Sequence, residues 1–236
     1  MTNPDTRVAI TFDVFDALLP IATAGPQGGS DFTVLSYTPV SGIALEGCDT
    51  LDPSCSEALT PVEVSDDAGQ ATLTVPGSFN GFFEFTGTGY LPSKLYTGQL
   101  LADASAFAPP VAIIGTEQVA LLASAVGVPM ELNPEAGVGH AFFQVYDCFD
   151  RHAAGVAFTL AIDAGPQTVQ WYLKNSLPST TATETDSVGS GGAVNVPAGA
   201  VTVTATLVAT KRTIGAISAV ITAGGTTFAW VRVRTH

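Results

Sequence analysis

The sequence predicts an all-β protein, built as two tandem β-sandwiches with one short linking helix. Three observations predict this class: the composition, a series of runs in which apolar and polar residues alternate, and a sequence pattern that occurs twice. The 236 residues are 46% hydrophobic and 12% charged, with 24 Gly and 15 Pro. Low charge with many turn-forming residues and abundant Thr and Val is typical of short strands joined by tight turns.

The repeated phrase is SDDAGQATLTVP at residues 65–76 and TDSVGSGGAVNVP at residues 185–197. In each copy an Asp precedes a Gly by three residues. An Asp in a turn accepts hydrogen bonds from nearby backbone amides, and a Gly supplies the positive φ that closes a hairpin. The sequence therefore predicts two structural turns, shaped by Asp66 and Gly69 and by Asp186 and Gly189.

The length also favours two units, because it exceeds one typical domain of about 100–200 residues. We predict a first β-sandwich domain at residues 1–110, a linker with a short helix at 111–138, and a second β-sandwich domain at 139–236.

Short alternating segments make up the first half. Residues 7–16, RVAITFDVFD, alternate apolar and polar side chains and predict a half-buried strand. More strands are expected in FTVLSYTPVSGIALEG, LTPVEVS, QATLTV and GFFEFTG, between turns rich in Gly, Pro and Asp. Such a series indicates a sandwich, and βαβ units are not expected.

The middle of the chain differs in composition. The segment LLADASAFAPPVAIIG is rich in small residues and Pro, which predicts a linker. In TEQVALLASAVG we expect a helix with Thr116 as N-cap and Gly127 as its stop. A helix this short is marginal alone, so we expect it to pack between the two units.

The β pattern returns after Gly139. We expect strands in HAFFQVYDC, GVAFTLAID, TVQWYLK, GGAVNVP, AVTVTATLVA, IGAISAVITA and TFAWVRVRT. In the last of these, Phe228 and Trp230 face oppositely to Ala229 and Val231, as the period of two requires.

Longer matching blocks surround the two phrases, with PVSGIALEG before the first and HAAGVAFTL before the second. Together they resemble the carboxypeptidase-regulatory-like domains, a branch of the transthyretin-like (prealbumin, Ig-like) β-sandwiches of exported and surface-anchored bacterial proteins. The usual sequence pattern of these domains is V-x-D-x-x-G-x-P-x-x-G-x-x-V, then T-D-x-x-G-x-F and a strand that ends before P-x-G. The second block matches at Val145, Asp147, Gly155, Thr185, Asp186, Gly189 and VPAGAVTVTA.

Each block also departs from the family. The second has Asp150 and His152 where the family has Gly and Pro. The first keeps Pro39, Gly42, Asp66 and Gly69, but it lacks an opening V-x-D and adds a loop with two cysteines. The resemblance implies a sandwich fold and an exported setting. Members mostly serve as structural, adhesive or accessory modules, so no catalytic residue is carried over.

Charge is distributed unevenly. Residues 1–110 hold 13 acidic and 2 basic side chains, whereas 111–236 hold 8 and 6, and the net charge is −13. Such a surface cannot neutralise phosphates, so nucleic acid is not expected as a partner. No apolar run reaches the ~20 residues that span a bilayer. We expect no membrane insertion, and an exported chain, at the cell surface or extracellular, whose export signal or lipid anchor is not in this sequence.

The three cysteines predict one disulfide and one free thiol. Cys48 and Cys55 flank DTLDPS, a segment that can reverse the chain and bring the two sulfurs together. We predict a disulfide there; zinc is the competing interpretation, but no second Cys/His pair lies nearby. Cys148 is left over and is expected to be a buried free thiol.

The residues that could carry chemistry form no complete set. No nucleophile-elbow or phosphate-loop motif occurs, so neither catalytic residues nor an enzymatic activity are predicted. Mixed nitrogen and oxygen ligands for a metal are available in His140 and His152, with Asp147 and Asp150 between them. We favour the competing interpretation that both histidines lie at the surface. Cofactors are therefore not expected, although calcium is a competing hypothesis for Asp13 with Asp16 or Asp66 with Asp67.

Aromatic residues leave a binding hypothesis open. Core packing explains most of them, but Trp171 and Tyr172 lie in the stretch that lengthens the second block and are candidates for ligand contact. The leading hypothesis is a non-enzymatic exported structural or interaction module that meets protein or glycan at the cell surface. The alternatives are a carbohydrate- or calcium-binding module and a self-assembling subunit of a surface filament.

Overall fold

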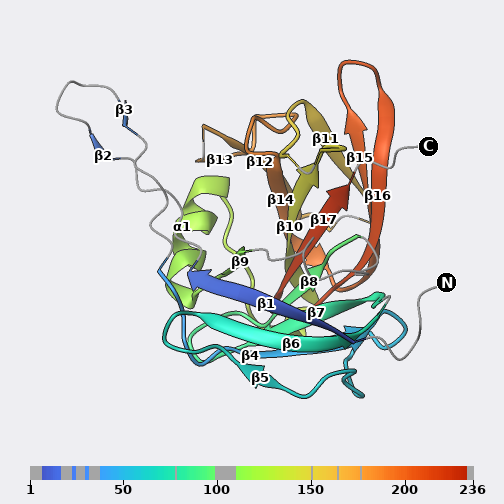
Figure 1. Ribbon diagram of the computed structural model, residues 1–236. Coiled ribbons are helices and arrows are strands. Elements are labelled where there is room, and N and C mark those ends of the chain that lie inside the picture. Colours follow the sequence, from blue (N-terminus) through green and yellow to red (C-terminus); the bar gives the residue numbers. More distant parts are fainter. Residues whose placement is uncertain are drawn as a thin grey trace.

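The computed structural model describes residues 7–16, 23–24, 30–31, 38–77, 79–98, 110–149, 151–163, 165–175 and 177–232. Within these ranges the chain is all-β with one α-helix, which confirms the predicted fold class (Figure 1). Residues 100–109 of the segment LLADASAFAPPVAIIG lie outside the described residues, as do Asp150 and residues 32–37 of an expected strand.

A nine-stranded sheet runs through the whole molecule. Its strands, in spatial order, are β13 (Leu177–Ser179), β12 (Val169–Lys174), β14 (Ser190–Pro197), β10 (Val138–Tyr146), β17 (Thr226–Arg232), β8 (Ser93–Tyr96), β7 (Gly81–Thr86), β4 (Ala44–Asp49) and β5 (Glu63–Val64).

Two three-stranded sheets pack against this long sheet. One has the order β6 (Gln70–Pro76), β1 (Arg7–Asp16), β9 (Pro110–Ile113), and the other has β11 (Val156–Ala161), β15 (Gly199–Leu207), β16 (Arg212–Ile221). The remaining elements are the pair β2 (Thr23–Ala24) and β3 (Ser30–Asp31), the helix α1 (Thr116–Val126) and a 3-10 turn, η2 (Pro134–Ala136).

The two halves of the chain use the same pairings. β1 is antiparallel to β6 and parallel to β9, and β10 is antiparallel to β14 and parallel to β17. The antiparallel sets β4–β7–β8 and β11–β15–β16 correspond in the same way. Each half therefore makes a two-layer sandwich. Parallel pairing of β8 with β17 joins the second layer of the first sandwich to the first layer of the second.

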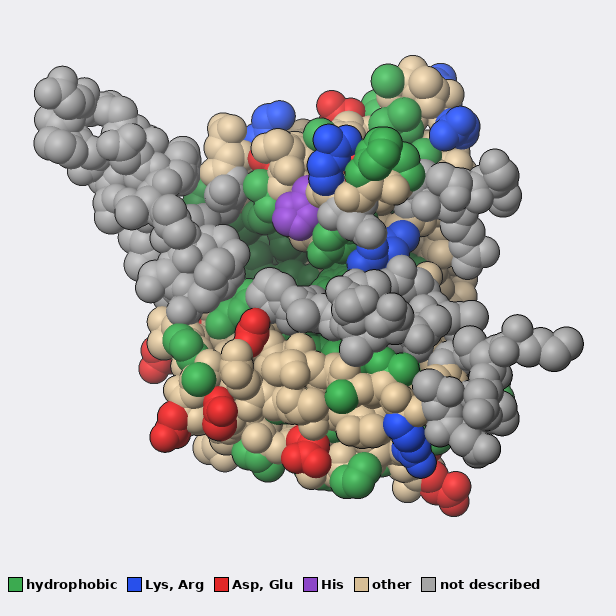
Figure 2. Space-filling view, in the orientation of Figure 1, with side chains coloured by type: hydrophobic (Ala, Val, Ile, Leu, Met, Phe, Trp, Pro, Cys, Tyr) green, Lys and Arg blue, Asp and Glu red, His purple; other side chains and the backbone are tan. Residues whose placement is uncertain are grey.

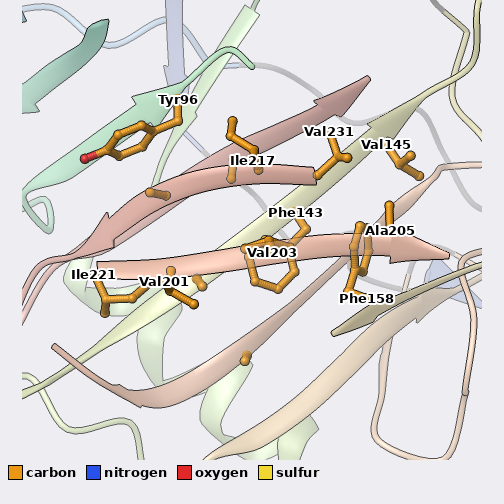
Figure 3. Packing of buried hydrophobic residues seen from close by; sticks show 14 of the residues in the cluster. Tyr96, Phe143, Val145, Phe158, Val201, Val203, Ala205, Ile217, Ile221 and Val231 are labelled. Carbon is orange, nitrogen blue, oxygen red and sulfur yellow. The ribbon is translucent and has the colours of Figure 1, made fainter. Parts of the chain in front are cut away.

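The cores show that the short sheets cover opposite faces of the long one. On β7, Phe83 belongs to the core under β1, whereas its neighbour Phe82 belongs to the core under β15. On β17, Trp230 and Val231 divide between the two cores in the same way. Tyr96 of β8 lies beside Ile217 in the second core, so the first half contributes to it (Figure 3).

The boundary between the halves differs in detail from its prediction. Pro110–Ile113, expected as linker, is an edge strand that starts with Pro, a position where no ladder donor is needed. The predicted division at 111–138 stays a prediction, to which the structure adds a sheet that hydrogen-bonds strands from both sides of it.

The helix begins one residue earlier than predicted, because Gly115 and not Thr116 is its N-cap, and it ends at Gly127 with φ +77°. Its apolar face packs on Trp171 of β12 and Val194 of β14, with Leu91 of the first half beside them. Within the described residues, no helix combines the length and apolar character needed to cross a bilayer.

Candidate functional site

The first Asp–Gly turn, between β5 and β6, is built from backbone hydrogen bonds. The Asp66 carboxylate accepts from the amides of Ala68 and Gln70, each at 2.9 Å. Gly69 has φ +77°, and its carbonyl accepts from the amide of Val14 at 2.7 Å. The carboxylate therefore shapes the turn, and the turn is tied to β1.

The second turn, before β14, has the same design. The Asp186 carboxylate accepts from the amide of Val188 at 2.9 Å, and Gly189 has φ +68°. The carbonyl of Gly189 accepts from the amide of Val145 at 2.9 Å. Because β10 supplies this amide as β1 does in the first turn, the two turns occupy equivalent places.

A hydroxyl residue precedes each Asp and bridges two strands. Ser65 Oγ donates to the carbonyl of Val40 at 2.8 Å and accepts from the amide of Ile43 at 3.0 Å. Thr185 Oγ1 makes the corresponding two bonds, at 2.8 and 3.1 Å, with the backbone around the start of β11. These hydroxyls are part of the scaffold.

The carboxylates of Asp13 and Asp16, which are candidate calcium ligands, accept hydrogen bonds from side-chain amides. Asp13 Oδ1 accepts from Gln70 Nε2 at 2.9 Å, and Asp16 Oδ1 accepts from Gln118 Nε2. Both bonds tie β1 to a neighbouring element. Calcium binding by these carboxylates stays a prediction.

Cys48 and Cys55 form a disulfide, with their Cα atoms 5.3 Å apart. Inside the loop, the Asp52 carboxylate accepts from the hydroxyls of Ser54 and Ser56 and from the amide of Glu57. These bonds favour the ionised form and hold the pKa of Asp52 well below its usual range. The segment is a preorganised loop that follows β4.

Beneath this loop lies a partly charged face of the long sheet. Lys94 is buried, with Nζ 4.9 Å from the centre of the Phe82 ring, and it donates to the carbonyl of Pro53 in the loop. Burial raises the pKa of the neighbouring Glu84 carboxyl, and the positive charge of Lys94 opposes that rise. The charge of Lys94 thus supports the loop that the disulfide closes.

Among the described residues, one group of three metal-ligating side chains has its ligand atoms within 4.8 Å of one another: Cys48, Cys55 and Glu84. Two of these atoms are the sulfurs bonded to each other. The remaining thiol, Cys148, is exposed, so the prediction of a buried thiol is wrong. It lies in the loop just beyond β10, outside the core that the strand reaches.

The two histidines weighed as metal ligands lie at opposite ends of β10. The surface position expected for His140 is wrong, because the residue is fully buried; its Nδ1 accepts from the amide of Asn195 at 3.3 Å, and its Nε2 lies 3.1 Å from the carbonyl of Glu131. Burial lowers the pKa of His140 to about 4. His152 is exposed and contacts the ring of Tyr146. The structure does not bring the two together.

The aromatic pair proposed for ligand contact faces inward. Trp171 is 3% exposed and packs under α1, whereas Tyr172 is 5% exposed and stacks on Phe158 in the second core. The Tyr172 hydroxyl accepts from the amide of Phe158 at 2.9 Å. Little of either ring is exposed, and ligand contact by these two residues stays a prediction.

Two grooves lie beside the disulfide loop and share Thr50 and Asn80. One, of about 400 Å³, is lined by Thr50, Asn80, Gly81, Tyr96, Thr97, Gly98, Thr202, Ala216, Ile217 and Ser218. The other, of about 480 Å³, is lined by Asp49, Thr50, Leu51, Leu59, Pro76, Phe79 and Asn80. Neither of these linings contains a His, Lys or Arg side chain.

Sequence reasoning missed several residues that matter here. Lys94 sits in a strand too short to show alternation, and Asn195, with φ +54°, sits inside β14, where its side chain holds the segment 129–131. An Asn is the side chain that tolerates positive φ best after Gly, which is the one signal the sequence offered. The exposure of Phe149 had no sequence signal at all.

No family model matches this chain, and no curated protein matches it. Among solved structures, it is similar to the shaft pilin SpaA from Lactobacillus rhamnosus GG, with 11% identity over 98% of this chain and 99% of that one, at a TM-score of 0.28.

Two further structures give similar values. GBS52, the minor pilin in the Gram-positive pathogen Streptococcus agalactiae, has 15% identity over 97% of each chain and a TM-score of 0.26. The Bacillus anthracis TIE protein has 11% identity over 97% of this chain and 34% of that one, with a TM-score of 0.28. TM-scores this low do not establish a common fold, so function has to be inferred from this chain's own residues.

Proposed function

We propose that this chain is a non-enzymatic structural or interaction module of an exported protein. The observation that carries the proposal is that the polar side chains at the two Asp–Gly turns form hydrogen bonds within the protein. The carboxylates of Asp66 and Asp186 and the hydroxyls of Ser65 and Thr185 bond to the protein's own backbone. Groups held in this way stabilise turns and strand junctions, and they are not poised as nucleophile and base.

The sheet that joins the halves supports a mechanical role. Four residue pairs link β8 to β17, from Ser93 opposite Thr226 to Tyr96 opposite Ala229. The hydroxyls of Ser93 and Thr226 lie 2.6 Å apart at the buried start of this joint. A continuous hydrogen-bonded sheet resists bending between the two sandwiches more than a flexible linker does.

The compartment is part of the same proposal. Disulfides persist in oxidising environments, so the Cys48–Cys55 bond supports a site at the cell surface or outside the cell. The resemblance of both repeats to carboxypeptidase-regulatory-like sandwiches supports a structural, adhesive or accessory role there.

The direct test is turnover. We expect the purified protein to show no hydrolysis above buffer on panels of esters, glycosides and peptides. Saturable turnover that survives repeated purification, and that is lost on substitution of a groove residue such as Asn80→Ala, would overturn the proposal. Calcium and glycan recognition, the two binding alternatives, are checked by melting with and without calcium and by a glycan array.

A further inference from the structure

Large apolar side chains are exposed at two opposite ends of the molecule. Among the described residues there are eight: Leu51, Leu59, Val62 and Val64 around β5, Phe149, Leu177 and Val208 in turns of the second sandwich, and Leu121 on α1. β5 lies at one extreme of the molecule and the turn between β15 and β16 at the other (Figure 1). Exposed apolar side chains that gather in this way mark interaction surfaces.

The first of these ends, called here the groove end, carries the groove lined by Leu51, Leu59, Pro76 and Phe79. Its walls are fixed before any partner arrives. The disulfide closes the loop, the Leu59 amide donates to the carbonyl of Gly47 at 2.7 Å, and the Leu51 amide donates to Asp49 Oδ1 at 2.9 Å. Little conformational entropy is left to lose when the groove is filled.

The groove end is acidic. Residues 38–77 contain seven Asp and Glu and no Lys or Arg. Asp49 lies in the groove lining itself, and Glu57 and Glu63 are exposed nearby. A partner surface that fills this groove is favoured if it combines an apolar side chain with positive charge.

The opposite end, called here the knob end, presents Phe149 just after β10, beside hydrogen bonds made by Asp147. Asp147 Oδ1 accepts from the amides of Phe149 at 2.8 Å and Arg151 at 3.0 Å. Its Oδ2 accepts from Arg151 Nε and Nη2 at 3.1 and 2.9 Å. The Phe149 ring is 74% exposed, and the guanidinium of Arg151 lies 5.1 Å from its centre. An ordered aromatic residue beside an Arg is the side-chain pairing that most often anchors an interface.

Basic residues are also exposed at strand ends of the second sandwich. Lys174 ends β12, Lys211 lies in the turn between β15 and β16, and Arg212 begins β16. None of the three forms an ion pair within the described part of the chain. The carboxylates nearby are Glu184 and Asp186, and Asp186 is bonded to backbone amides. Figure 2 shows most Lys and Arg over the upper part of the visible face and most Asp and Glu over the lower part.

We propose that two copies of this chain join head to tail, with Phe149 of one copy inserted into the groove of the next. This inference rests on the proposed structural role and names the partner. A groove of about 480 Å³ accommodates a phenyl ring, and its acidic surroundings complement the exposed Lys174, Lys211 and Arg212 of the second sandwich. Because the two surfaces differ, the contact is heterologous: a pair of joined copies keeps one free groove and one free knob, to which further copies can add.

The decisive variants remove the knob and the groove separately. Sedimentation velocity of the full chain at increasing concentration should show growing oligomers. Phe149→Ala, and separately the double variant Leu51→Ser with Leu59→Ser, should each weaken association by about 30-fold or more, as loss of an anchor residue does. Leu121→Ser, at an exposed leucine on α1, is the control and should associate as the parent protein does.

Mixing the two variants separates this geometry from other modes of association. The knob variant keeps an intact groove and the groove variant keeps an intact knob, so an equimolar mixture should form one-to-one dimers and nothing larger. Association should also weaken from 50 to 500 mM NaCl, because part of it is electrostatic.

A parent protein that stays monomeric at several hundred micromolar, or a Phe149→Ala variant that associates normally, would overturn head-to-tail joining. Far-ultraviolet circular dichroism and melting verify that each variant is folded. Both negative results leave the turnover test untouched, so failure of this inference is distinguishable from failure of the proposed function.

Discussion

Individual glycines show how the turns are specified. Gly69 and Gly89 both have positive φ, +77° and +86°. A Cβ at Gly69 would lie 2.4 Å from the carbonyl oxygen of Val14, whereas a Cβ at Gly89 would meet nothing within 4 Å. The first position is constrained by backbone conformation and by a neighbouring strand, and the second by conformation alone.

The pair gives a matched stability prediction. Gly89→Ala should lower the free energy of unfolding by about 1 kcal/mol, the cost of left-handed backbone for a side chain. Gly69→Ala should cost about 3 kcal/mol or more, because β1 or the turn must also move. Urea unfolding measures both, and equal losses would show that the close approach to β1 is unimportant.

His140 is the residue whose titration should matter most for stability. Its pKa is about 4 in the folded protein and about 6.5 when exposed in the unfolded chain. Between these values the unfolded state binds more protons, so stability should fall as the pH drops from 6.5 to 4. The full loss is on the order of 3 kcal/mol, since each pKa unit corresponds to about 1.4 kcal/mol.

Unfolding curves between pH 4 and pH 7 test this expectation. His140→Gln should remove most of the slope in this range, whatever its effect on stability at pH 7. His152→Gln should remove a smaller part of the slope, because burial lowers the pKa of this more exposed histidine as well. An unaltered slope in the His140 variant would assign the pH dependence to other groups.

At the scale of elements, the short disulfide loop contacts both the long sheet and the groove. It follows β4, covers Lys94 and forms one wall of the groove end. Its closure spans a sequence separation of seven. In the chain-entropy account a loop of this length contributes about 2–3 kcal/mol.

Replacing both cysteines, Cys48→Ala with Cys55→Ala, should therefore lower the free energy of unfolding by about 2–3 kcal/mol. It should also weaken self-association, because Leu51 and Leu59 lose their fixed positions. Cys148→Ser, at an exposed free thiol, should change neither property. Mass spectrometry under non-reducing conditions that finds three free thiols would remove the basis of this prediction.

For the whole molecule, the β8–β17 joint decides how the halves behave. Trp230, from the second half, packs in the core of the first, and Tyr96, from the first half, packs in the core of the second. Neither core is complete without residues from the other half. The two sandwiches should therefore unfold together.

Differential scanning calorimetry checks this cooperativity. We expect one transition whose calorimetric and van't Hoff enthalpies agree, as a two-state process requires. Two separate peaks, or an enthalpy ratio well above one, would instead show that the sandwiches unfold independently in spite of the shared sheet.

Local chemistry determined much of this protein from the sequence alone. Period-two runs such as residues 7–16 placed strands, and Asp–Gly pairs placed turns, because these features depend on a residue and its close neighbours. Apolar residues ending at Gly127 placed the one helix. The same local reasoning brought Cys48 and Cys55 together.

The tertiary structure decided what depends on distant partners. Residues 93 and 226 are far apart in the chain, and neither strand carries a signal that names the other, so the joined sheet could not be read from composition or spacing. Burial of Trp171 and exposure of Phe149 were equally hidden, since an aromatic side chain looks the same in sequence whichever way its backbone turns it. Strands and turns depend on residues close together in the sequence, whereas the surface that stays exposed depends on how all the elements pack.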